Sequence, residues 1–128
     1  MQALAGLLGL AAMVTAPSGC GSGGIHIEAS TEEATVKGTV KVHGKLVDGG
    51  VLHFNGFNAK RQVHTKDATV GKDGRYTAQA YIGANTVTLT PPKPRTKAQG
   101  REFFGLEYDE RTVNVQSGEN TADLEFLP

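Results

Sequence analysis

The pattern of apolar and polar residues changes once along the chain, near residue 20. From Ala3 to Val14 nearly every side chain is apolar and none is charged. This run is shorter than the roughly 20 residues that a membrane-spanning helix needs, but it fits the core of a signal peptide, which has about 7–15. From Thr35 onward apolar and polar residues alternate instead, as in strands with one buried face. The pattern predicts a signal segment followed by a β domain.

The alternating part predicts several short strands joined by glycine-containing turns. Asp73-Gly74 favours a tight hairpin, and weaker strands are predicted at 62–65 and 68–70. No segment keeps a helical period for three turns. The fold class expected is all-β, a sandwich of about seven antiparallel strands. The residues expected to face its core are Val36, Val40, Val42, Leu52, Phe54, Tyr76, Ala78, Ala80, Ile82, Val87, Leu89, Val113, Val115, Ala122, Leu124 and Phe126.

The chain has one cysteine, Cys20, between small residues and a Gly/Ser-rich stretch. Gly19-Cys20 resembles the cleavage point of a bacterial lipoprotein signal peptide, in which the cysteine is acylated and becomes the first residue. That family prefers Leu where this chain has Pro17. The resemblance implies an exported protein, held by lipid on Cys20 in a membrane of the bacterial cell envelope. The alternative is an ordinary secretory signal with an incidental cysteine.

Three regions are therefore expected. Residues 1–19 are the lipoprotein-type signal peptide, and residues 20–33 are a flexible Gly/Ser tether. Residues 34–128 are the β-sandwich domain, whose length suits one core. Ile25 and Ile27 could instead add a short edge strand.

Several motifs resemble carboxypeptidase regulatory-like domains. They are Gly38-Thr39-Val40 with Gly44 to Val51, then Asp73-Gly74-Arg75-Tyr76 with Thr86 to Leu89, and finally Thr112 to Phe126. The resemblance implies a transthyretin-like (prealbumin-like) sandwich of about seven strands in two sheets. It supplies no catalytic residues.

The balance of charge and the types of reactive residue argue against several classes of function. The 13 basic and 13 acidic residues balance, which argues against a nucleic-acid partner. The four histidines lack the spacing of zinc ligands, and Ser117 lies in a predicted turn without a nucleophile elbow. We therefore predict no enzyme activity, no metal and no cofactor.

The long connection over residues 91–110 is the candidate interaction loop, because loops of this length in compact domains are often functional. Its candidate residues are Arg101, Phe103, Phe104 and Tyr108. The alternative is that Phe103, Leu106 and Tyr108 fold back and cap one end of the sandwich.

Two functions remain. The first is a lipid-anchored envelope protein whose sandwich is a non-catalytic structural or protein-interaction module. The second is a module that binds carbohydrate or another small ligand, with Tyr81 and the threonines Thr77, Thr86 and Thr88 as its platform. The partner is accordingly an envelope protein or a glycan, besides the membrane itself.

Overall fold

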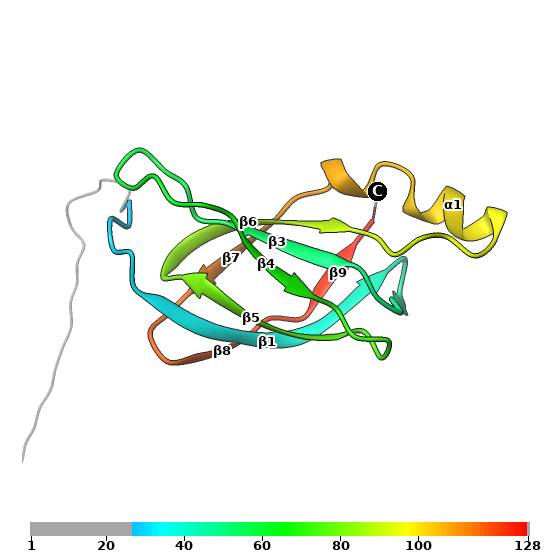
Figure 1. Ribbon diagram of the computed structural model, residues 1–128, viewed down its shortest axis with the longest axis horizontal. Helices are drawn as coiled ribbons and strands as arrows, with labels where there is room; N and C mark the ends of the chain where they lie inside the picture. The colour runs from blue at the N-terminus through cyan, green and yellow to red at the C-terminus, as the bar shows by residue number, and fades with distance from the viewer. Residues whose placement is uncertain (1–26, 128) are drawn as a thin grey trace, which may run out of the picture.

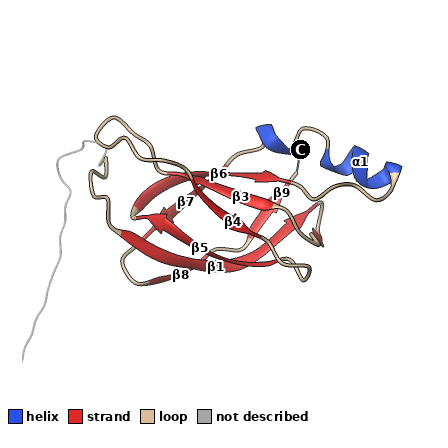
Figure 2. Cartoon of the chain, viewed as in Figure 1, coloured by secondary structure: helices blue, strands red, loops and turns tan. Residues whose placement is uncertain are grey.

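The computed structural model describes residues 27–127, which form a sandwich of two β-sheets (Figures 1 and 2). The strands are β1 (Glu33–Val42), β2 (Lys45–Leu46), β3 (Val51–Asn55), β4 (Lys66–Thr69), β5 (Arg75–Tyr81), β6 (Gly83–Thr90), β7 (Arg111–Val115), β8 (Glu119–Thr121) and β9 (Leu124–Phe126). A short helix α1 (Lys97–Phe103) and a 3₁₀ turn η2 (Leu106–Tyr108) lie between β6 and β7. The predicted β-sandwich is confirmed.

Strand β1 is the centre of the first sheet. It pairs antiparallel with β5 and, at its end, with β2, and it pairs parallel with β8 and β9. The second sheet has the order β4-β3-β6-β7 and is antiparallel throughout. The expected antiparallel pairing therefore holds for the second sheet and for β1 with β2 and β5, whereas β8 and β9 run parallel to β1. Alternation shows which face is buried, but it does not show the direction of the neighbouring strand.

The core contains the residues that the alternation predicted, with two differences. Val36, Leu52 and Leu89 are among those with no exposed surface, whereas Ile82 and Ala122 are only partly buried against the core. The predicted strand at 62–65 is wrong: this stretch is irregular, and the neighbouring strand covers Lys66–Thr69. In this stretch Val63 is only half-buried and its neighbours are polar and exposed. The stretch therefore has no continuous apolar face that a strand could bury.

The passage from β8 to β9 lies against β1 at Gly38. A Cβ atom on Gly38 would overlap the carbonyl oxygen of Ala122, so only glycine allows this approach. The Thr39 amide donates to Asp123 Oδ1 at 2.9 Å, and the Tyr76 hydroxyl donates to the Ala122 oxygen at 2.6 Å. Burial raises the pKa of Tyr76, which keeps the hydroxyl protonated as a donor. The junction of the two parallel strands is thus fixed from both sides.

The chain just before β1 is attached to the sandwich. Asn58 Nδ2 donates to the Glu28 carbonyl at 2.8 Å, Arg61 Nη1 donates to the Ser30 carbonyl, and the Ile82 amide donates to the Glu32 carbonyl at 2.9 Å. These bonds attach residues 28–32 to the sandwich, and β1 itself begins at Glu33, inside the range expected for the tether. Cys20, the signal segment and the first part of the tether lie outside the described residues.

Candidate interaction surface

The predicted interaction loop contains a helix that the sequence did not indicate. Helix α1 begins after Thr96, whose hydroxyl accepts a hydrogen bond from the Gln99 amide at 3.1 Å. None of its seven residues is buried. A helix this short with no buried stripe leaves no apolar period to detect, so the search for a helical repeat missed it.

The apolar residues of the loop divide between core and surface. Leu106 has no exposed surface, and Phe103 is partly buried against the core. Phe104 and Tyr108, in contrast, are 83% and 82% exposed. Phe103 and Leu106 therefore cap the sandwich, as the alternative predicted, whereas Tyr108 does not. Of the four candidate residues, Arg101, Phe104 and Tyr108 lie on the surface, and we call these three the α1-end surface.

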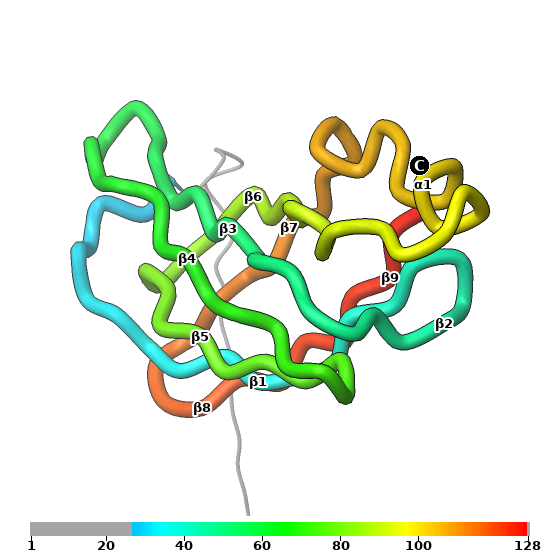
Figure 3. The backbone as a smooth tube through the Cα atoms, turned by 45° about the vertical axis from the view of Figure 1, so that its right-hand side comes forward, coloured from blue at the N-terminus to red at the C-terminus, as the bar shows by residue number. Residues whose placement is uncertain are grey.

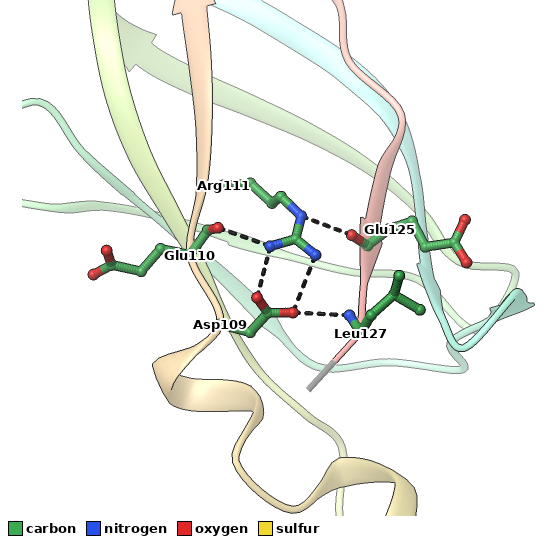
Figure 4. Close-up of polar contacts among 5 residues, drawn as sticks. All are labelled: Asp109, Glu110, Arg111, Glu125 and Leu127. Carbon is green, nitrogen blue, oxygen red and sulfur yellow. Dashed lines mark hydrogen bonds and ion pairs between the residues drawn. The ribbon is translucent and has the colours of Figure 1, made fainter.

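The end of this loop is fastened to the sandwich by an ion pair (Figure 4). Arg111 Nη1 and Nη2 donate to the two Asp109 carboxylate oxygens at 2.6 and 3.2 Å, and Arg111 Nε donates to the Glu125 carbonyl at 2.9 Å. The Leu127 amide also donates to Asp109, at 2.8 Å. Burial alone would raise the pKa of Asp109, but the hydrogen bonds from Arg111 and Leu127 outweigh it and hold the pKa below its usual value. Asp109, which follows Tyr108, is thus held against the chain at the end of β9.

A hollow separates α1 from the β1–β2 hairpin. It has a volume of about 180 Å³ and includes Leu46, Glu102 and Phe103 in its lining. Lys45 lies 3.8 Å from Glu102 across it, and Arg95 lies 3.4 Å from Asp48. Arg101 lines a neighbouring open hollow with His43 and Lys45. These exposed ion pairs hold the helix against the hairpin only weakly.

The structure does not bring the predicted carbohydrate platform together. Thr77 is on β5 in the first sheet, whereas Thr86 and Thr88 are on β6 in the second. Their side chains therefore face outward from opposite sheets of the sandwich. Tyr81 is half-buried, and the Arg61 guanidinium and the Lys66 ammonium lie 5.6 and 5.3 Å from its ring centre. The platform prediction is wrong because alternation assigns faces within a strand and not between sheets.

The histidines are spread over the molecule. His43 occupies a turn with φ 50°, His64 is exposed, and His26 lies outside the described residues. His53 lies 2.7 Å from both Asp67 and Thr90 through its two ring nitrogens. Among residues 27–127 no three His, Cys, Asp or Glu side chains group in a way that could hold a metal ion.

Sequence reasoning missed a polar cluster at the other end of the sandwich. Arg61 and Asn85 are buried, with 4% and 0% of their surface exposed. Both are polar, so the alternation of apolar residues gave no sign of their burial. A hollow near them is lined by Asn55, Thr86 and Asn114, among others. These residues lie far apart in the sequence and meet only through the pairing of β3, β6 and β7. Only the strand register could have revealed them.

Comparison with known proteins gives a fold but no family. No family model matches the chain, and no curated protein matches it. Two solved structures are similar in fold, both described as DUF3823 family proteins. The one from Parabacteroides merdae has a TM-score of 0.54 at 19% identity, covering 77% of this chain and 48% of that one. The one from Bacteroides ovatus has a TM-score of 0.45 at 13% identity, covering 74% and 44%.

The chain spans about half the length of these two proteins. At this level of identity the likeness concerns the fold of a β-rich domain only. Within residues 27–127, no helix has both the length and the apolar character that crossing a membrane requires.

Proposed function

We propose that this protein is a lipid-anchored envelope protein whose β-sandwich presents the α1-end surface to a protein partner. The observation that carries this proposal is that the N-terminal side of the described chain and the α1-end surface lie at opposite ends of the sandwich. The described chain enters at one end of the long axis of the sandwich, whereas α1 and η2 lie at the other (Figures 1 and 3). A domain held through its N-terminal side therefore turns the α1-end surface away from its attachment.

The anchor itself rests on the sequence. Cys20 follows an uncharged apolar run and resembles the acylated cysteine of bacterial lipoproteins. Two or more acyl chains make membrane attachment stable, whereas a single chain binds only weakly and reversibly. The likeness to carboxypeptidase regulatory-like, transthyretin-like domains agrees with a module that has no catalysis of its own.

The surface rests on its exposed aromatic rings. Phe104 and Tyr108 expose most of their area at one end of the domain, and Asp109 with Arg111 fixes the backbone beside them. Aromatic residues are enriched where protein interfaces gain their affinity. Because Asp109 and Arg111 fix the backbone next to Tyr108, little ordering of that segment would oppose binding. A partner with an apolar recess and a polar rim fits this surface.

Membrane attachment is tested by replacing the cysteine. In a bacterial host, the wild-type chain should fractionate with membranes and partition into detergent, whereas Cys20→Ala should be recovered in the soluble envelope fraction. Mass spectrometry of the N-terminus should show an acylated Cys20 in the wild type. Equal membrane recovery of the two chains, with an unmodified cysteine, would contradict the anchor.

Partner binding is tested by removing the two exposed rings together. We expect the detergent-extracted wild-type chain to retain a protein from envelope extract that the Phe104→Ala/Tyr108→Ala variant does not retain. Phe57→Ala is the matched control, because Phe57 is 57% exposed but lies outside the α1-end surface. Melting temperatures of all three chains should agree. Unchanged retention by the double variant would remove the α1-end surface from the proposal.

A further inference from the structure

A polar hollow lies on the outer face of the second sheet, at its Gly83 end. It has a volume of about 340 Å³, near the lower limit of small-molecule sites, which run from about 300 to 1,000 Å³. Its floor follows from the strand register: Ala84 lies opposite Asn114, and Thr86 lies opposite Asn55. The small Ala84 leaves a depression between these larger polar side chains. The hollow is thus built into the sheet.

Its polar groups have hydrogen-bonding capacity left over. Within the described residues, the side chains of Asn114 and Thr86 have no hydrogen-bond partner. Asn55 Oδ1 accepts from the Phe57 amide at 3.0 Å, which leaves its Nδ2 group uncommitted. An asparagine amide both donates and accepts, and a threonine hydroxyl does the same. The hollow therefore presents both donors and acceptors from two strands and a strand end.

The wall of the hollow is rigid. Asn58 Nδ2 donates to the Glu28 carbonyl, and its Oδ1 accepts from the Lys60 and Arg61 amides. Arg61 then joins three segments through the carbonyl oxygens of Gly56, Ser30 and Ile82. Gly83, with φ 103°, lets Glu28 approach, since a Cβ atom there would lie 2.6 Å from that of Glu28. A site held this way loses little freedom when it binds a ligand.

The lining selects the chemical class of the ligand. Among the described residues that line it, Glu28 is the single ionisable one, so none of these residues is a cation that would attract a phosphate or carboxylate, and one carboxylate does not make a metal site. Phe57 also lines the hollow and is 57% exposed, which gives an apolar ring beside the amides. Amide and hydroxyl groups next to an aromatic ring suit the hydroxyl groups and C–H face of a sugar.

The geometry points to a binding site for a neutral carbohydrate of one or two residues, formed by Asn55, Thr86 and Asn114 with Phe57 at the rim. It lies at the opposite end of the sandwich from the α1-end surface and does not depend on the partner proposed there. It also differs from the platform that the sequence suggested, with which it shares only Thr86.

The test is a titration of the ¹⁵N-labelled full chain, in detergent, with maltose, cellobiose, lactose and chitobiose at millimolar concentration. For at least one sugar we expect saturable NMR shifts at the amides of Asn55, Phe57, Ala84 and Asn114. Asn114→Ala should weaken binding about tenfold, as expected when hydrogen bonds of about 1.4 kcal/mol in total are lost. Ala84→Leu should abolish it by filling the depression.

Two controls separate binding in this hollow from binding elsewhere on the molecule. Thr77→Leu, an exposed position on the other sheet, and Phe104→Ala/Tyr108→Ala should both bind as the wild type does. Circular dichroism and melting temperature should show that Ala84→Leu is folded, since Ala84 is exposed. The inference is overturned if none of the four sugars shifts these amides, if Ala84→Leu binds normally, or if glucuronate binds more tightly than the neutral sugars.

Discussion

Arg61→Ala is expected to lower the free energy of unfolding by about 3 kcal/mol or more. The residue is only 4% exposed, and its side chain donates to the carbonyl oxygens of Gly56, Ser30 and Ile82. Losing the guanidinium leaves those acceptors without a partner, at about 1–3 kcal/mol for each group that water cannot reach. Urea unfolding followed by circular dichroism measures the change.

Two further variants show whether the fork of donors causes this effect. Arg61→Lys keeps the charge, but one ammonium on a flexible stem cannot replace donors fixed in a plane, so most of the loss should remain. Arg75→Ala removes an arginine whose side chain is 79% exposed, and its effect should stay within about 0.5 kcal/mol. If Arg61→Ala is as stable as Arg75→Ala, the residue does not hold the three segments together.

Leu106→Ala is the second large effect, at about 2–5 kcal/mol of destabilisation. Leu106 has no exposed surface, and η2 packs against β6, so the truncation leaves a cavity at the end of the core. Phe104→Ala, two residues earlier, removes a ring that is 83% exposed and should change stability by less than about 0.5 kcal/mol. Thermal and urea unfolding of the two variants give the comparison.

The contrast between these neighbours tests how the loop is divided. If Leu106 is a core residue and the Phe104 ring is exposed, the two variants must differ clearly in their free energy of unfolding. If Phe104→Ala destabilised the domain as much as Leu106→Ala, Phe104 would be part of the core and not of the α1-end surface. Near-wild-type stability of Leu106→Ala would mean that η2 does not cap the sandwich.

The period of two predicted most of the core because it records burial on one face of a strand. Tyr76, Ala78 and Ala80 are buried as expected, and so are Val87 and Leu89 between outward threonines. The same reasoning does not account for Asn85, a polar residue that is fully buried in β6. Its Nδ2 donates to the Tyr81 and Gly83 carbonyls, so a local hydrogen-bond pattern determined its position.

Features that depend on tertiary contact were not predictable in this way. The parallel pairing of β8 and β9 with β1 joins distant parts of the chain, and the polar hollow needs the register of three strands. The candidate loop was found by its length and aromatic residues, yet its sequence did not show which ring is buried. Phe103 and Phe104 are adjacent and chemically identical, and only the fold distinguishes them.

The position of β1 also has a consequence for the time at which the domain can fold. Its partners β8 and β9 come from the far end of the domain: Thr39 and Asp123, which bond to each other, are 84 residues apart. Contacts between such distant residues form slowly, because a long loop must close before they contribute any stability. During synthesis one edge of β1 has no partner until residues 119–126 have been made. The sheet that contains β1 can therefore be completed only when nearly the whole domain has been synthesised, although β2 and β5 are available to pair with β1 earlier.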